Sequence, residues 1–345
     1  MRTIFWEDNE LKMIDQRRLP NALEIVAFQG HKEVAKAIRD MVVRGAPAIG
    51  AAGAFGLALA AQESAAASTH ELITDMEEAA EILKSARPTA VNLAWAINRV
   101  MKKVNEKKFD VDGLRRAMLD EAQKIADEDV EINKRMARHG AALIDDGDTV
   151  IHHCNTGSLA TVEWGTALGV IRMAHEQGKH IHVLVDETRP RLQGSRLTAW
   201  ELEQYGIPYD IISDNMAGYF LSTGKVQKVL FGADRVAANG DVANKIGTYM
   251  LSLAAHDNGV PVYAVVPTST IDLTLRNGSL IPIEEREPDE VLDIQFHGER
   301  AAPRGAKARN PAFDVTPNRL LSAIVTENGI VYPPFESNLP GFTLP

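Results

Sequence analysis

Four short apolar runs in the second half of the chain lead into side chains that can take part in chemistry. The first run, Thr149–His153, is followed by Cys154, the single cysteine of the chain. The other three runs are followed by Asp186, Asp214 and Asp234. Taken singly, each aspartate could be an ordinary cap or turn residue. Together, at the carboxyl ends of parallel strands, they predict an active site with thiol and carboxyl groups, because open sheets bind ligands at that edge.

Two turns and an arginine cluster are places where an anion could bind. Asn155–Ser158 lies between a predicted strand and a predicted helix, where free backbone N–H groups and the helix dipole favour negative charge. Arg44–Gly50 places an arginine before the first turn of a helix that could equally be no more than tightly packed. Arg189, Arg191 and Arg196 gather in one loop, although a solvated loop explains them equally well. We therefore predict an anionic small-molecule substrate.

Motifs for several common cofactors and reactions are missing. The turn after residue 154 lacks the Gly-x-Gly-x-x-Gly pattern of dinucleotide-binding folds, and the chain has no Walker-type phosphate loop. It also lacks the Gly-x-Ser-x-Gly motif of serine hydrolases. His152 and His153 are adjacent, so on a strand they point to opposite faces and do not easily share a metal ion. We expect one to be a core histidine and the other to line the site.

The composition is that of an ordinary globular protein of 345 residues, 45% hydrophobic and 24% charged. A net charge of −10 disfavours nucleic acid and membrane surfaces as partners. One cysteine excludes an intrachain disulfide and fits a reducing compartment. Met1–Pro20 has no apolar core and does not resemble a signal peptide. Gly45–Ala61 is short and rich in Gly and Ala, which favours a buried helix over a membrane span, so we expect a cytoplasmic protein.

The hydrophobic periodicity changes near Asp145. Before it, apolar residues recur at three- and four-residue steps, which is typical of amphipathic helices, after short strands at the start of the chain. After it, short apolar runs alternate with helical segments, which is typical of a parallel sheet covered on both faces. We predict an α/β fold with a Rossmann-like doubly wound parallel sheet in residues 146–345. Residues 1–145 are expected to form a smaller, mainly helical domain with a short β-sheet.

The strands expected in the second half are Thr149–His153, His180–Val185, Tyr209–Ile212, Lys228–Phe231 and Val260–Val266. The helices expected there are Ala160–His175, Gly194–Tyr205, Ala243–Asn258 and Asn318–Thr326. The last of these follows Thr316 and Pro317, a good cap and first-turn pair. Glu284–Asn310 is rich in Pro, Gly and Arg and predicts a long irregular excursion.

Several segments resemble, in the same order along the chain, the methylthioribose-1-phosphate isomerases of methionine salvage. The resemblance covers nearly the whole chain, and several long motifs in order are far more specific than any one of them. The matching segments are Arg44–Ala48, His153–Gly157, Asp186–Gly194, Gly232–Arg235, Asn244–Thr248 and Arg304–Asp314.

The resemblance implies an enzyme that converts 5-methylthioribose 1-phosphate to 5-methylthioribulose 1-phosphate. It implies a homodimer that uses neither a metal nor an organic cofactor. It also implies catalytic roles for Cys154 and Asp234. The substrate-binding residues that it implies are Arg44, Gly45, Ala46, Arg87, Gln193, Asn244 and Lys245.

The chemistry of that reaction gives these residue types a physical reason. Phosphate blocks the anomeric carbon, so ring opening needs a proton donor. A carboxyl group in a water-excluded crevice can serve as that donor, because burial raises its pKa. We predict this acid/base role for Asp234. Hydrogen then moves from C2 to C1, either through a cis-enediol with Cys154 carrying the proton, or as a hydride with Cys154 stabilising the transition state. A helix N-terminus soon after Cys154 would help to hold a thiolate.

Two other functions are compatible with the same fold. The regulatory subunits of the translation initiation exchange factor share it and are interaction proteins, but the intact motifs around Cys154 and Asp234 disfavour that interpretation. Ribose-1,5-bisphosphate isomerase is a nearer alternative. It would need a second basic site where a methylthio group needs an apolar pocket, and the sequence does not locate that pocket.

Overall fold

The computed structural model describes residues 1–88, 90–104, 106 and 109–343, and it divides into two compact units. The first unit contains Met1–Lys134 and Thr156–Gly165. The second contains Arg135–Asn155 and Thr166–Pro345. The expected domain boundary after residue 145 stays a prediction, because the compact units divide after Lys134 and assign a short later segment to the first unit.

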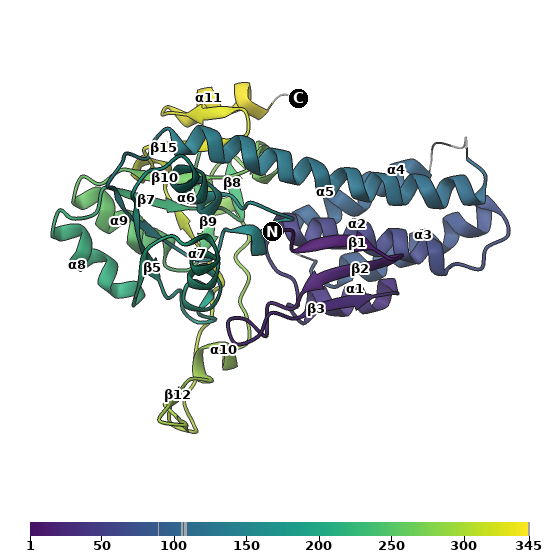
Figure 1. Cartoon of the computed structure of the whole chain (residues 1–345), viewed down its shortest axis with the longest axis horizontal. Helices are drawn as coiled ribbons and strands as arrows, with labels where there is room; N and C mark the ends of the chain where they lie inside the picture. Colours follow the sequence, from purple (N-terminus) through teal and green to yellow (C-terminus); the bar gives the residue numbers. More distant parts are fainter. Residues whose placement is uncertain (89, 105, 107–108, 344–345) are drawn as a thin grey trace. The chain divides into compact units, whose positions relative to one another are not determined.

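The first unit combines a small antiparallel sheet with helices, as predicted (Figure 1). In the sheet, Leu11 and Met13 are buried and face the core, while Glu10 and Lys12 between and beside them are half-buried. Its strands are β1 (Ile4–Glu7), β2 (Glu10–Ile14) and β3 (Ile25–Phe28), in the order β1-β2-β3. Its helices are α1 (His31–Arg39), α2 (Ala46–Glu63), α3 (Thr69–Ser85), α4 (Val91–Val104) and α5 (Val111–Ala141), the last of which continues into the second unit.

Helix α2 is the buried helix that the uncharged Gly45–Ala61 segment predicts. Every residue from Ala48 to Ala61 is buried. A Cβ on Gly50 would lie 3.0 Å from the carbonyl oxygen of Asn92, so the small side chains of α2 permit close packing against α4. In the part of the chain that the structure describes, none of the helices combines the length and the hydrophobicity needed to cross a membrane.

The buried carboxyl group of Asp129, on α5, should make the stability of the protein depend on pH. Its carboxyl group accepts a hydrogen bond from the backbone N–H of Val162 at 2.8 Å, and burial raises its pKa to about 7. Between pH 4 and 7 the folded chain therefore holds a proton that the unfolded chain releases, so the free energy of unfolding falls as pH rises. In Asp129→Asn this pH dependence should disappear. At pH 8 the free energy of unfolding of the variant should be about 2 kcal/mol higher than that of wild type.

Urea unfolding of both proteins at pH 5 and pH 8 checks this expectation, with Asp120→Asn, exposed on the same helix, as the matched control. An equal difference between wild type and Asp129→Asn at both pH values would contradict it.

The second unit is built on a seven-stranded sheet of order β16-β15-β10-β7-β4-β5-β6. All neighbouring strands are parallel except β15 and β16. The strands are β4 (Thr149–His152), β5 (His182–Asp186), β6 (Tyr209–Ile212), β7 (Lys228–Phe231), β10 (Val262–Val265), β15 (Ala323–Thr326) and β16 (Gly329–Val331). The chain adds β5 and β6 on one side of β4 and β7, β10 and β15 on the other, which confirms the doubly wound fold and places its topological switch point between β4 and β7.

Both faces of this sheet are buried. Ile151 and Leu184 pack in one core with residues of α8, α9 and α11, and the alternate residues Val150 and Val183 are buried as well. The helices of this unit are α6 (Ala167–Glu176), α7 (Ala199–Tyr205), α8 (Ala217–Ser222), α9 (Thr248–Asp257), α10 (Asp289–Leu292) and α11 (Phe335–Thr343).

A second, four-stranded sheet of order β11-β8-β9-β14 was not foreseen. The helix expected at Ala243–Asn258 begins only with α9, and its first residues belong to a strand. The turn between β8 and β9 contains Asn239 and Gly240, and Asn-Gly is a strong hairpin signal that would have identified the pair. The strands are β8 (Arg235–Ala237), β9 (Val242–Lys245), β11 (Ile271–Asp272) and β14 (Phe313–Thr316).

Two other helix predictions are wrong in whole or in part. Asn318–Thr326 forms only a 3-10 turn, Asn318–Leu320, followed by β15, because the short apolar run pairs in parallel with β10 and is completely buried. The helix expected at Ala160–His175 begins only at Ala167. Trp164 and Gly165 have φ angles of 76° and 88°, which a right-handed helix cannot accommodate.

Candidate active site

The strand ends singled out by their chemistry lie at one edge of the seven-stranded sheet. Cys154 follows β4 and Asp234 follows β7, so the two residues flank the switch point. Asp186 ends β5, and Asp214 follows β6 on the same side. This confirms the predicted convergence of strand ends, since all four strands are parallel.

Cys154 is buried and has a strained backbone that two hydroxyl groups hold. Its φ angle is 67°, in the left-handed region that side chains other than glycine rarely adopt. The backbone N–H of Cys154 donates to Thr188 Oγ1 at 2.9 Å, and Thr198 Oγ1 donates to the Cys154 carbonyl at 2.8 Å. Neither threonine was predicted, because both lie far from Cys154 in the sequence.

The helix N-terminus expected soon after Cys154 is absent. A 3-10 turn of three residues, Ser158–Ala160, follows Cys154, and the first α-helix after it is α6. The Asn155–Ser158 turn therefore has no α-helix dipole to hold an anion or to stabilise a thiolate.

Thr198→Val is expected to lower kcat/KM by about tenfold and to lower the free energy of unfolding by about 1–3 kcal/mol, because the buried Cys154 carbonyl loses its donor. Valine has the shape of threonine but cannot donate to the Cys154 carbonyl, so the strained peptide loses one of its two restraints. Thr223→Val is the matched control, because Thr223 Oγ1 makes the same kind of bond, to the Phe220 carbonyl, at an exposed site. Equal kinetics for the two variants would show that the restraint at Cys154 has no effect on the reaction.

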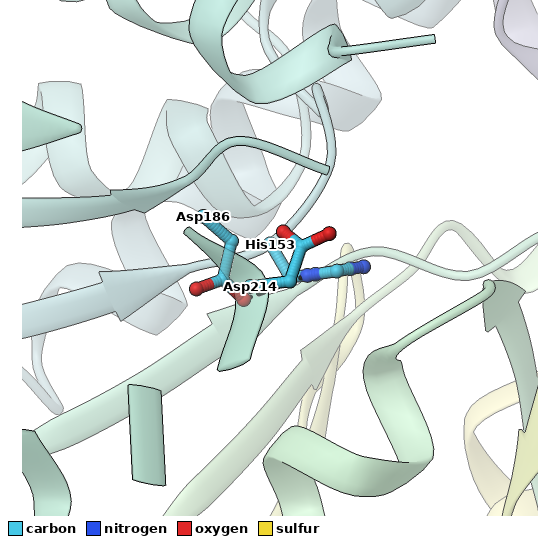
Figure 2. Close-up of side chains that lie close together, drawn as sticks. All are labelled: His153, Asp186 and Asp214. Atoms are coloured by element: carbon cyan, nitrogen blue, oxygen red, sulfur yellow. Dashed lines mark hydrogen bonds and ion pairs between the residues drawn. The ribbon is translucent and has the colours of Figure 1, made fainter. Parts of the chain in front are cut away.

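His153 and Asp186 form a buried pair beside Cys154 (Figure 2). His153 Nδ1 lies 2.7 Å from Asp186 Oδ2, and His153 Nε2 lies 3.0 Å from the Ile246 carbonyl oxygen. Burial lowers the pKa of His153, but the hydrogen bond and charge of Asp186 outweigh this effect and leave it raised. Burial also raises the pKa of Asp186, against the opposing effect of His153.

His152 is the other member of the histidine pair and lies in the core. It is completely buried, and burial lowers its pKa to about 3, so its ring is neutral. His152 is therefore the core histidine that the sequence predicts, and a site-lining role for His153 stays a prediction.

His153, Asp186 and Asp214 are close enough to be considered as metal ligands. Their nearest ligand atoms lie within 4.8 Å of one another, although the sequence spacing gave no sign of such a cluster (Figure 2). Both oxygens of Asp214 accept backbone N–H groups, from Thr188 at 2.6 Å and Arg189 at 2.7 Å. Both ring nitrogens of His153 are also hydrogen-bonded, so the donor set favours protons over a cation.

Asp234 is positioned by the second sheet. It precedes β8, and its backbone N–H donates to the Ala243 carbonyl of β9 at 2.9 Å. Its side chain is exposed, which contradicts the water-excluded crevice expected from the sequence. The strand end leaves Asp234 at the surface of its own unit because the chain turns directly into a hairpin there.

Asn244 and Lys245 lie on β9 and not on a helix. Lys245 is buried, donates to the Ala312 carbonyl at 2.8 Å, and lies 4.8 Å from the centre of the Phe313 ring. The side-chain amide of Asn244 donates to Thr248 Oγ1 at 2.9 Å. Both residues are therefore held in place before any substrate arrives.

Gln193 lies in the loop after β5 and directly precedes the helical turn Gly194–Thr198. It is buried, and its Oε1 atom has no hydrogen-bond partner among the described residues. The next residue must be glycine, because a Cβ on Gly194 would lie 1.7 Å from the Asp186 carbonyl oxygen. A buried amide oxygen of this kind is available to a ligand.

The other expected binding residues belong to the first unit. Gly45 has a φ angle of 92°, and a Cβ there would lie 2.3 Å from the carbonyl oxygen of Ala160, so only glycine fits before α2. Arg44 precedes it, Ala46 begins α2, and Arg87 follows α3. That these residues share one site with Cys154 stays a prediction.

Part of the arginine cluster has a structural role. Arg191 forms an ion pair with Glu290 at 2.8 Å, and Arg189 donates to the Val291 carbonyl at 2.9 Å. Both partners lie on α10, within the predicted irregular excursion Glu284–Asn310. These two side chains therefore hold that excursion and are not an open anion site.

Comparisons with known proteins show what this chain is similar to over nearly its full length. Residues 42–333 match the model of the initiation factor 2 subunit family. A methylthioribose-1-phosphate isomerase of Thermosipho africanus is 55% identical over 98% of this chain and 96% of its own. One of Geobacter sulfurreducens is 52% identical over 100% of this chain and 99% of its own.

Two solved structures are similar over nearly the full chain. The 5-methylthioribose 1-phosphate isomerase of Pyrococcus horikoshii has a TM-score of 0.93 and 48% identity, and the match covers 99% of this chain and 95% of that one. A chain of A. fulgidus, described as the delta subunit of translation initiation factor eIF-2B, has a TM-score of 0.90 and 46% identity, with 99% of both chains covered.

Proposed function

We propose a reaction from the premise that this chain belongs to the initiation factor 2 subunit family and, within it, to the methylthioribose-1-phosphate isomerases. The chain converts 5-methylthioribose 1-phosphate to 5-methylthioribulose 1-phosphate, a step of methionine salvage. The observation that carries the proposal is the position of Cys154 and Asp234 on either side of the switch point between β4 and β7.

Asp234 acts as the acid and base of ring opening. Phosphate on C1 prevents spontaneous opening, so the C–O bond breaks only if the ring oxygen receives a proton. A carboxyl group held by the β8–β9 hairpin can deliver that proton. Because Asp234 is exposed, the substrate has to displace water when it binds there.

Cys154 acts at the hydrogen transfer from C2 to C1. Its position after β4 is fixed by bonds at its N–H and its carbonyl, so the thiol meets the substrate in one orientation. The transfer goes either through a cis-enediol, with the sulfur carrying the proton, or as a hydride shift. In heavy water, deuterium at C1 of the product would exclude the hydride shift.

The substrate is held by charge and by hydrogen bonds. We propose that Arg44 with Gly45 and Ala46, and Arg87, bind phosphate or hydroxyl groups. Gln193, Asn244 and Lys245 bind the sugar hydroxyls and phosphate, which fits the available amide oxygen of Gln193 and the fixed positions of the other two. No metal or organic cofactor takes part.

We propose that the chain works as a homodimer in the cytoplasm. Large apolar side chains are exposed on or next to helices α8 and α9, which pack against each other, and such surfaces are typical of interfaces. These side chains are Met216, Tyr219, Met250 and Leu253. Light scattering of the wild-type protein should give a molar mass twice that of one chain. For Tyr219→Lys the measured molar mass should move towards that of a single chain. A wild-type monomer at micromolar concentration would contradict the dimer.

The substrate is tested by comparing 5-methylthioribose 1-phosphate with ribose 1,5-bisphosphate under identical conditions. A kcat/KM at least about a hundredfold higher for the methylthio sugar is expected, because a second phosphate would be desolvated without a partner in an apolar pocket. Turnover of the bisphosphate alone would keep the reaction type and reject the substrate. Turnover of neither would favour a non-catalytic role, as in the translation initiation factor that the chain also resembles.

A further inference from the structure

We propose that His153 and Asp186 share one proton and act as a positioning pair. The pair fixes the position of Cys154 relative to the segment Asn244–Gly247, which comprises the end of β9 and the turn after it. The kinetic part of this inference rests on the proposed function, because it assigns substrate contacts to Cys154, Asn244 and Lys245. The protonation of the pair can be measured without any substrate.

The hydrogen bonds of the His153 ring require this proton (Figure 2). The Ile246 carbonyl can only accept, so Nε2 must carry a hydrogen to bond to it. The 2.7 Å contact between Nδ1 and Asp186 Oδ2 then needs a second hydrogen, on either the nitrogen or the oxygen. The pair is therefore an imidazolium with a carboxylate or an imidazole with a carboxylic acid, and it has no net charge in either form.

The surroundings of Asp186 favour a pair without net charge. Its side chain is 1% exposed, and its other oxygen, Oδ1, has no hydrogen-bond partner among the described residues. A buried carboxylate with a bare oxygen would be costly if its charge were not balanced. The charged or titratable groups that act on the pair are His152, Glu187, Asp214 and Asp314, and the acidic ones favour the proton.

The pair joins two parts of the proposed site that are distant in the sequence. His153 directly precedes Cys154, and its ring packs against the backbone of the Asn244–Gly247 segment. Gly247 has a φ angle of 104°, and a Cβ on it would lie 2.8 Å from Cε1 of the His153 ring, so the turn fits around the ring closely. Losing the ring's bond to Ile246 should therefore loosen the turn that follows Asn244 and Lys245 at the end of β9.

The first test is a pH titration of the wild-type protein by NMR with ¹⁵N-labelled histidine. The His153 signals are assigned by their absence in His153→Gln. We expect no titration of this ring between pH 6 and 8, together with a downfield, slowly exchanging proton between Nδ1 and Oδ2. Titration with a midpoint near the usual value of about 6.5, giving a neutral ring beside a carboxylate, would overturn the proposal.

The second test separates a shared proton from a required negative charge. In Asp186→Asn the amide N–H can donate to Nδ1 of a neutral ring, so kcat/KM should stay within about threefold of wild type. In Asp186→Ala the ring has no hydrogen-bond partner at Nδ1. The KM for the sugar phosphate should then rise by about tenfold, and kcat should fall by a smaller factor. Asp186→Asn losing as much activity as Asp186→Ala would contradict the proposal.

An exposed pair of the same residue types supplies the control. His182 and Asp210 lie on β5 and β6, with Nε2 2.9 Å from Oδ2, and both side chains are exposed. Asp210→Ala should leave KM and kcat unchanged. If Asp186→Ala does not fold, Asp186→Asn and the wild-type titration still decide the question. A wild type that holds the proton but turns over no sugar phosphate would reject the proposed function and leave the proton-sharing pair standing.

Discussion

Cys154→Ala is expected to lower kcat by at least about a thousandfold and to leave the fold intact. The thiol can accept and return a proton or stabilise charge at C1, and alanine can do neither. The change removes a single buried atom, so the stability loss should be about 1 kcal/mol. Turnover of 5-methylthioribose 1-phosphate, followed by NMR, and urea unfolding measure the two effects.

Cys154→Ser is the informative companion to that variant. Serine keeps the size and the backbone bonds to Thr188 and Thr198, but its hydroxyl is far less acidic than a thiol. If sulfur carries the proton, serine should lose nearly as much activity as alanine. Near-normal kcat in the alanine variant would remove Cys154 from the mechanism altogether.

Asp234→Asn is expected to lower kcat by about a thousandfold with no loss of stability. An amide cannot deliver a proton to the ring oxygen, and general acid–base catalysis contributes about 10²- to 10⁴-fold. The side chain is exposed and asparagine has nearly the same size, so the substitution should change stability little. The KM should change little, because the effect falls on the chemical step.

Asp257→Asn is the control for this variant, since Asp257 is an exposed aspartate at the end of α9 in the same unit. Its kinetics should equal those of wild type. Equal kcat for Asp234→Asn and Asp257→Asn would contradict the acid role of Asp234.

The sequence predicts the parallel sheet and its chemical edge well. The runs that form β4, β5, β7 and β10 are largely apolar, as buried parallel strands require, and they lie close to their expected positions. The run that forms the edge strand β6 contains the exposed Asp210 and is also found where expected. Since the direction of parallel strands fixes which ends meet, the placement of Cys154 with Asp186 and Asp214 at one edge follows from local pattern alone.

The second sheet and the region after Ala160 could not be predicted in the same way. β9 and β15 are segments of four residues whose state depends on pairing with distant strands, namely β14 and β10. The late start of α6 depends on two consecutive positive φ angles, at Trp164 and Gly165, and a tryptophan in that conformation has no sequence signal.

The positioning contacts of the site also lie beyond sequence reasoning. Thr188 and Thr198 bond to Cys154 from different elements, and His153 pairs with Asp186 across a parallel strand pair. Nothing in their spacing distinguishes them from ordinary polar residues. The exposure of Asp234 is another property of the folded chain, because it depends on where the β8–β9 hairpin begins.

The most direct test of the central claim is to incubate chelator-treated wild-type protein with 5-methylthioribose 1-phosphate and to follow the sugar by NMR. We predict that 5-methylthioribulose 1-phosphate forms at the same rate with and without the chelator, because the groups proposed for the chemistry are a thiol and a carboxyl group. No ketose product under either condition, or a product that forms only after a metal ion is returned, would contradict the account.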